Sequence, residues 1–273
     1  MANNIILALC EGPHDVAFLH KILKTSSFKT AQNTKLGEYP TPMNQFIVEE
    51  VKKSNVNDLN IQTVRRTLLP GSVLKRDDNF VFLYALGGDS KKDTRQSILS
   101  KIVSFLPKEG KIEILPKDTT LNLLYFFDAD DKGTENRLKE VQNEVKEIIN
   151  DLEFLDDAIL AKYREMLLGC YIFSNVESQN GKLEDLLIPI MLENNEEIFE
   201  NAKQYFDTHY EEKRGKKKGA DLKKAIIGIS GQLQKSGSTN TVIISQSDYL
   251  NDNKIKSSDK CSEIISFFEK FTK

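Results

Sequence analysis

Residues 5–15 have the sequence IILALCEGPHD, a continuous apolar run that ends in a short acidic turn. A short apolar run of this kind is typical of a strand that is covered on both faces. After the turn the pattern changes, because Val16 and Leu19 fall at helical spacing and Pro13 suits the first turn of a helix. The stretch therefore predicts a buried strand, an acidic turn and a helix.

A second acidic turn follows another apolar run, since residues 121–133 have the sequence LNLLYFFDADDKG. Thr134 is suited to cap a long helix whose apolar stripe runs from Leu138 to Ile149. Two further strands are predicted at 80–86, which Gly87 and Gly88 close, and at 169–173.

This alternation of strands and helices predicts an α/β fold, a mainly parallel sheet with right-handed crossovers. The carboxyl ends of parallel strands lie at one edge of a sheet. Glu11 and Asp128 are therefore expected to face the same crevice. The weakly periodic segment at about 25–79 is interpreted as an insertion with one helix near residues 60–68.

The last third of the chain, residues 191–273, is expected to pack on the same core as an α-rich extension. It contains a predicted helix at 196–206, a predicted strand at 241–245 and a closing helix with a phenylalanine-rich face. A further helix is predicted at about 157–166. These patterns indicate packing and no chemistry of their own.

The composition limits the classes of function. No stretch approaches the roughly 18 to 20 apolar residues of a membrane span, and residues 1–4 lack the features of a secretory signal, so a cytoplasmic protein without a membrane partner is expected. The three cysteines form no Cys-x-x-Cys pair, which argues against a disulfide framework or a structural zinc site. With 38 basic and 41 acidic residues, any nucleic-acid binding must come from a local patch.

One such patch is the basic run at residues 213–219. Clustered cations neutralise backbone phosphates without reading bases, although a solvated loop is the other interpretation of such a run. The candidate nucleic-acid contacts are Lys213, Arg214, Lys216, Lys217 and Lys218.

The two acidic turns in their strand context resemble the toprim domain shared by topoisomerases, primases and the overcoming-lysogenization-defect type of nuclease. The phrase EGPHDVAFL at 11–19 is most similar to the nuclease branch, and NGKLEDLL at 180–187 resembles a stand-alone branch of toprim-like proteins. The resemblance covers about residues 4–190 and implies a toprim-like domain at residues 1–190, with the insertion at about 25–79 inside it.

The resemblance also implies a metal site. Glu11 would ligate a metal or exchange protons near it, and Asp128 and Asp130 would ligate Mg²⁺, with Mn²⁺ as a substitute. Asp15 and Glu184 are candidates for completing a second site, in which two metals roughly 3.5 to 4 Å apart stabilise phosphodiester cleavage. Independently of the resemblance, carboxylates gathered this closely raise each other's pKa unless a cation pairs with them.

In the nuclease branch a downstream lysine supports the reaction, and Lys223 or Lys224 is the candidate here. The expected function is thus a metal-dependent endonuclease acting on DNA or RNA, coupled to a separate ATPase or sensor protein in phage defence. The chain has no Gly-x-x-x-x-Gly-Lys-Ser/Thr loop, so an ATPase within it is not expected. The alternative is a non-catalytic toprim-like module that binds nucleic acid or protein.

Each candidate also has a structural interpretation. Asp15 and Glu184 suit the first turns of helices, where acidic side chains are favoured anyway. Gly87 and Gly88 are interpreted as a plain turn, and His14 as a hydrogen-bonded surface residue. Rival enzymes with an acidic turn after a strand, such as glycosyltransferases and aspartyl-phosphate phosphatases, leave the Glu11 turn unexplained.

Overall fold

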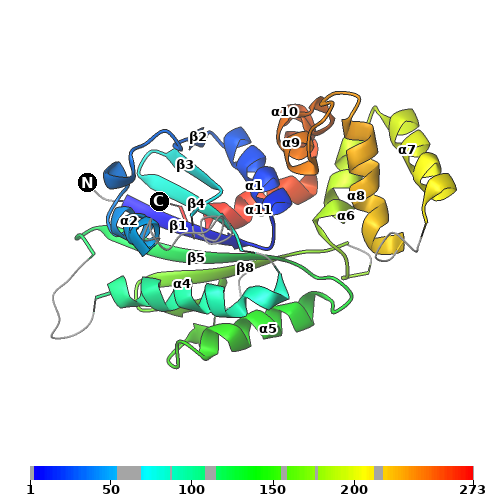
Figure 1. The fold of residues 1–273 in the computed structure, drawn as a ribbon. Helices are drawn as coiled ribbons and strands as arrows, with labels where there is room; N and C mark the ends of the chain where they lie inside the picture. The colour runs from blue at the N-terminus through cyan, green and yellow to red at the C-terminus, as the bar shows by residue number, and fades with distance from the viewer. Residues whose placement is uncertain are drawn as a thin grey trace.

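The computed structural model describes residues 3–53, 69–86, 88–107, 115–154, 159–175, 178–211 and 218–272. Its centre is an eight-stranded sheet with the order β2-β3-β4-β1-β5-β8-β7-β6. Figure 1 shows this sheet running through the middle of the molecule. The strands are β1 (Asn3–Cys10), β2 (Lys29–Thr30), β3 (Ser72–Arg76), β4 (Asn79–Ala85), β5 (Thr119–Asp128), β6 (Glu153–Phe154), β7 (Ile159–Tyr163) and β8 (Met166–Phe173).

The four central strands β4, β1, β5 and β8 are parallel, and the strands at both edges are antiparallel. Cys10 at the end of β1 is in register with Ala85 of β4 and Phe126 of β5. The carboxyl ends of these strands are therefore level with one another, as the apolar runs predicted. The α/β fold class is confirmed.

Helices cover both faces of the sheet. Figure 1 shows α1 and α11 on one face and α4 and α5 on the other. The helices are α1 (Pro13–Thr25), α2 (Met43–Lys53), α4 (Lys92–Phe105), α5 (Thr134–Lys146), α6 (Leu183–Leu192), α7 (Glu196–His209), α8 (Lys218–Gly231), α9 (Asn240–Gln246), α10 (Asp252–Ser257) and α11 (Asp259–Glu269). None of the helices in the described parts of the chain is long and apolar enough to cross a membrane.

The side chains of β1 alternate between two hydrophobic clusters. Ile6 and Ala8 pack with α1, while Ile5 and Leu7 pack with residues of α4 and α5. Because both faces are covered, the strand is apolar throughout instead of alternating. Helices α6 to α11 pack in the same cluster as α1, so residues 191–272 share this core where they are described.

The described parts of the segment at 25–79 extend one side of the sheet. In it β2 and β3 extend the sheet antiparallel to β4, and α2 packs on the same side as α4. The helix predicted near residues 60–68 lies outside the described residues.

Two predicted elements are wrong. The segment 241–245, expected as a strand, belongs to helix α9, in which Ile243 and Ile244 are buried. Ile243 packs against Gly231 of α8 so closely that a Cβ there would lie 2.3 Å from its Cδ1 atom. The described part of the helix expected at 157–166 contains strand β7, which pairs antiparallel with β8. In both places tertiary packing overrides the local pattern.

Candidate functional site

A cavity of about 310 Å³ opens at the carboxyl ends of β1 and β5. Residues from the ends of both strands, from the first turns of α1 and α6, and from α8 line it, although they are far apart in the sequence. The structure thus brings together four predicted carboxylates and one of the two predicted lysines. Its lining residues are Glu11, Gly12, Pro13, His14, Asp15, Gly88, Asp128, Glu184 and Lys224.

Glu11 connects the two acidic turns. Its backbone N–H donates a hydrogen bond to Phe126 O at 3.2 Å, which extends the pairing of β1 with β5. Its carboxylate Oε2 accepts a hydrogen bond from the backbone N–H of Asp128 at 3.2 Å. A Cβ on Gly88 would lie 2.9 Å from Glu11 Oε1, so a larger residue at position 88 would displace this carboxylate. The glycine is therefore part of the site, whereas the sequence indicated only a turn.

Asp15 is 5% exposed and accepts a hydrogen bond from the backbone N–H of Gly12 at 2.7 Å. This bond caps α1 and lowers the pKa of Asp15, but burial outweighs it, and the nearby charges of Glu11 and Glu184 add to the burial. Together they raise the pKa of Asp15 to about 7. A buried carboxylate of this kind is stabilised by any positive charge that enters the cavity.

Asp128 lies at the end of β5 in the same surroundings. Its Oδ1 accepts a hydrogen bond from the backbone N–H of Leu183, the first residue of α6, at 2.8 Å. Burial, followed by the charges of Asp15 and Glu11, raises the pKa of Asp128 to about 8. In the absence of a cation, both aspartates are therefore partly protonated near neutral pH.

Glu184 is buried at 3% exposure but has basic neighbours. His14 Nδ1 lies 3.3 Å from its Oε1, and Lys224 Nζ lies 3.9 Å from the same oxygen. Burial by itself raises the pKa of Glu184, yet the His14 hydrogen bond and the Lys224 charge together hold that pKa below its usual value. Glu184 is thus the buried carboxylate of this cavity that keeps its negative charge most readily. His14 also lines the cavity, whereas its position in the sequence indicated a hydrogen-bonded surface residue.

Asp130 is not among the residues that line the cavity. Its carboxylate forms ion pairs with Arg137 and Lys182, both at 2.8 Å. Its backbone has a φ of 50°, a left-handed conformation that aspartate tolerates, and it exchanges two backbone hydrogen bonds of 2.8 and 2.9 Å with Gly181. Asp130 therefore ties the β5 turn to the loop before α6, which differs from the role of metal ligand predicted for it.

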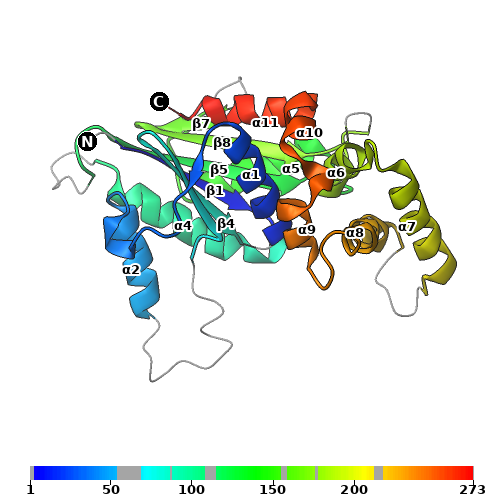
Figure 2. The same ribbon diagram turned by 90° about the horizontal axis from the view of Figure 1, so that it is seen from above.

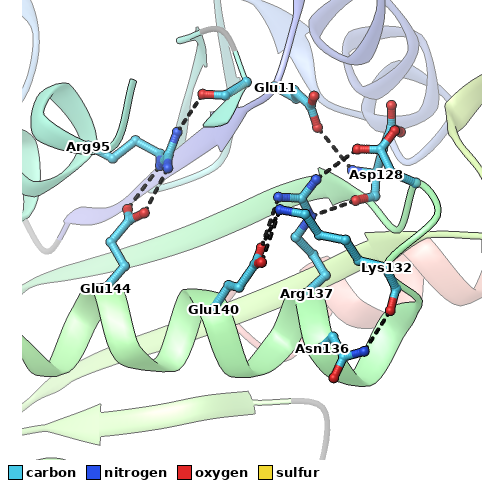
Figure 3. Close-up of polar contacts among 10 residues, drawn as sticks. Glu11, Arg95, Asp128, Lys132, Asn136, Arg137, Glu140 and Glu144 are labelled. Atoms are coloured by element: carbon cyan, nitrogen blue, oxygen red, sulfur yellow. Dashed lines mark hydrogen bonds and ion pairs between the residues drawn. The ribbon is translucent and has the colours of Figure 1, made fainter. Parts of the chain in front are cut away.

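Two buried arginines hold the loops of the site from the opposite side of the sheet (Figure 3). Arg95 of α4 donates to Gly88 O at 3.0 Å and makes two hydrogen bonds, of 2.9 and 2.7 Å, to Glu144 of α5. Arg137 of α5 donates to Asp128 O at 2.9 Å. Both arginines are at most 5% exposed.

The helical periodicity of α5 contains a signal for one of these arginines, Arg137. Arg137 falls on the same helical face as Val141 and Val145, where an unpaired charge would be costly. A charged residue on an apolar stripe indicates a buried partner, but the sequence does not say which one.

The basic residues predicted to take part separate into three groups. Lys224 lines the cavity, whereas Lys223 forms an ion pair with Asp185 and does not. Lys213, Arg214, Lys216 and Lys217 lie outside the described residues, and so does the side chain of Lys218 at the start of α8.

The donor set of the cavity suits a hard divalent cation such as Mg²⁺, because all four acidic ligands offer carboxylate oxygens. In the described parts of the chain, however, no group of three or more His, Cys, Asp or Glu side chains is already arranged to hold a metal ion. Binding a cation in the cavity would therefore require Glu11, Asp15, Asp128 or Glu184 to rotate toward it.

Comparison with solved structures gives one distant neighbour, described as the crystal structure of hypothetical protein PH0156 from Pyrococcus horikoshii OT3. The TM-score is 0.55 at 14% sequence identity, and the alignment covers 98% of this chain and 95% of the other, a likeness of fold. Comparison with curated proteins gives no match. Residues 5–273 match the family described as "Protein of unknown function (DUF3226)". Since this match spans nearly the whole chain, the protein belongs to that family.

Proposed function

We propose that the protein is a metal-dependent nuclease of the toprim type, which hydrolyses phosphodiester bonds of DNA or RNA with Mg²⁺ or Mn²⁺. The observation that carries this proposal is the convergence of Glu11, Asp15, Asp128 and Glu184 on one cavity at the carboxyl edge of the parallel strands. The raised pKa values of Asp15 and Asp128 support it, because burial and the neighbouring carboxylates destabilise their charged forms and a bound cation would reverse this.

The residues of the cavity would have different roles in this reaction. Asp128 and Asp15, joined by Glu11 or Glu184, would hold the cation, which when bound polarises the phosphoryl oxygens and stabilises the charge that develops on them. The hydrogen bonds from Gly12 and Leu183 orient two of these carboxylates. Lys224 is 53% exposed at the edge of the cavity, a position from which it attracts a phosphate group. Arg95 and Arg137 are positioning residues that act through the backbone of both loops.

One observation favours a second candidate, a non-catalytic module that binds nucleic acid. Among the described residues, no three His, Cys, Asp or Glu side chains are already arranged to hold a metal ion, and a module without a catalytic metal would need no such group. The two candidates differ in what the carboxylates do. A nuclease requires Asp128 for metal-dependent cleavage, whereas a binding module retains its function when Asp128 is changed.

The test incubates the purified protein with plasmid, single-stranded DNA and tRNA in Mg²⁺, Mn²⁺ or chelator. The proposal expects metal-dependent cleavage of at least one substrate, and its loss in Asp128→Asn. Asp131→Asn is the matched control, because Asp131 is an exposed carboxylate in the same turn and lies outside the cavity. Thermal melting of both variants shows that the fold is retained.

Two results would contradict the nuclease. One is the absence of metal-dependent cleavage of every substrate by the wild-type protein, and the other is undiminished cleavage by Asp128→Asn. Nucleic-acid binding that persists in chelator and in Asp128→Asn, without any cleavage, would support the binding module instead.

A further inference from the structure

A second and larger cavity, of about 650 Å³, runs along the flank of α1. Its walls are one face of α1, the start of β3, the end of β4, and residues of α9 and α10. Helices α1 and α9 lie side by side in both views (Figures 1 and 2). The volume is within the range of about 300 to 1,000 Å³ that is usual for small-molecule sites.

The α1 wall of this cavity is cationic. Its charge comes from Lys21 and Lys24, because the lowered pKa of His20 favours a neutral ring. Lys21 donates a hydrogen bond of 3.1 Å to Ser247 O, and Asp252 is the acidic residue among the lining. Lys24 is exposed and, within the described residues, its ammonium group forms no hydrogen bond or ion pair. Burial lowers the pKa of His20, and the charge of Lys24 lowers it further. An anionic ligand in the cavity would be attracted to the ammonium group of Lys24.

The remaining walls combine apolar and neutral polar groups. Val16, Ala17 and Ala85 are the apolar part of the lining, and Ala85 is the exposed residue among them. His20 Nδ1 forms a hydrogen bond of 2.6 Å with Ser72 Oγ, and Gln246 adds an exposed amide at the rim. Amide, hydroxyl and imidazole groups recognise the edges of nucleobases, whereas ammonium groups bind phosphate. The combination is suited to a nucleotide.

This cavity adjoins the acidic one, because Pro13 lines both. With the helical rise of 1.5 Å per residue, Lys21 and Lys24 lie roughly 9 and 14 Å along α1 from Asp15. A nucleic-acid strand with a phosphodiester bond in the acidic cavity can therefore continue along the same helix toward these lysines.

We propose that the cavity along α1 binds one unpaired nucleotide of the strand whose phosphodiester bond enters the acidic cavity, so that the substrate is single-stranded. This inference rests on the proposed function and specifies its substrate class. The base lies between α1 and α9, and the next phosphate lies against Lys21 and Lys24. A base that enters a cavity between two helices leaves the stack and the pairing of a duplex, and this costs least in a single strand.

The chain contains no tryptophan, which allows a direct binding assay. Gln246→Trp replaces one amide of the lining with the chain's sole tryptophan, which is excited selectively over the tyrosines and whose emission a stacked base quenches. This variant is titrated, in chelator, with a single-stranded DNA or RNA oligonucleotide, the matching duplex and inorganic phosphate. We expect quenching by the single strand, at least tenfold weaker binding of the duplex, and no quenching by phosphate.

The Lys24→Glu substitution is then introduced into the Gln246→Trp protein, and Lys29→Glu in the same protein is its control. Lys29 lies on β2, is exposed, and is not part of the cavity lining. We expect Lys24→Glu to weaken single-strand binding by at least about tenfold, or 1.4 kcal/mol, and Lys29→Glu to change it by less than twofold. Lys24→Glu should also raise the KM for cleavage by at least about tenfold and leave kcat unchanged, whereas Lys29→Glu should change KM by less than twofold.

The outcomes separate this inference from the proposed function. Metal-dependent cleavage with equal effects of Lys24→Glu and Lys29→Glu, or equal affinity for duplex and single strand, overturns the inference and leaves the nuclease standing. Selective loss of single-strand binding in Lys24→Glu, without cleavage under any condition, supports the nucleotide cavity and overturns the nuclease.

Discussion

The first turns of α1 and α6 have the same local design. In α1 the carboxylate of Asp15 accepts a hydrogen bond of 2.7 Å from the backbone N–H of Gly12, and in α6 Asp185 accepts one of 2.9 Å from Lys182. Each aspartate occupies the third helical position, where a carboxylate caps the helix and interacts favourably with its dipole. By this local criterion the two aspartates are equivalent.

Their surroundings differ. Asp185 forms an ion pair with Lys223. Asp15 is buried beside Glu11 and Glu184, and its pKa rises to about 7. The capping hydrogen bond of each aspartate thus depends on a residue three positions earlier in the sequence. The charge environment of each aspartate depends instead on residues that are distant in the sequence and close in the fold. The comparison separates a helix cap with a structural role from one that also belongs to a reactive site.

The largest difference is expected in activity. Asn keeps the oxygen that accepts the capping hydrogen bond but removes the charge, so Asp15→Asn and Asp185→Asn both preserve the caps. We expect Asp15→Asn to lower cleavage by about 100- to 1,000-fold, the range typical of losing one preorganised electrostatic group. Asp185→Asn should lower cleavage by less than about fivefold, because a partly exposed ion pair contributes at most about 1 kcal/mol.

Single-turnover cleavage rates in saturating Mg²⁺ measure this difference. Circular dichroism confirms that the helices remain in both variants. Similar rates for the two variants would show that Asp15 is only a cap and would remove the distinction between the two helix ends.

The sequence predicts the central sheet well, because a strand buried on both faces has a continuous apolar run. β1, β4, β5 and β8 each contain such a run, and the parallel order then places Glu11 and Asp128 at the same edge. The convergence of these two residues follows from topology alone, since the ends of adjacent parallel strands coincide.

The roles of individual carboxylates could not be predicted in the same way. Asp128 and Asp130 are two residues apart in one turn, yet one lines the cavity and the other pairs with Arg137 and Lys182. The left-handed backbone at Asp130 and the pairing with Gly181 decide this difference. Both depend on contacts with a loop about fifty residues later, for which the local pattern contains no signal.

Helix α9 shows a related limit. Its β-branched residues Val242, Ile243 and Ile244 favour a strand locally, but packing against Gly231 of α8 stabilises a helix. Short apolar runs of this length fit either structure, and only the partner element decides between them.

The second largest effect concerns stability in the metal-free protein. The folded-state pKa values of about 7 for Asp15 and about 8 for Asp128 are above the ordinary value of 3.8. Between these limits the folded protein binds more protons than the unfolded chain, so the free energy of unfolding falls as the pH rises. We expect wild type to lose about 3 kcal/mol between pH 6.5 and 8.5, since each pKa unit corresponds to about 1.4 kcal/mol.

Urea unfolding in chelator at both pH values measures this slope. Asp15→Asn should flatten it and be more stable than wild type at pH 8.5, whereas Asp185→Asn should retain the wild-type slope. Starting at pH 6.5 limits the opposite contribution of His20, whose lowered pKa makes stability rise with pH below that point. Parallel slopes in all three proteins would contradict an unusual electrostatic state of Asp15.

The smallest effect is expected at α6, and it tests whether the Asp185 cap depends on its cation. Lys223 is 40% exposed and its partner Asp185 11% exposed, so the pair is partly screened by water. We expect Lys223→Gln to lower the free energy of unfolding by about 0.5 kcal/mol at low ionic strength. The difference should disappear in 1 M salt, where the Debye length is about 3 Å. The capping hydrogen bond from the Lys182 backbone N–H does not involve Lys223, so α6 should keep its helical content in this variant. Loss of helix signal in circular dichroism, or a difference that persists in 1 M salt, would show that Lys223 does more than form a screened ion pair.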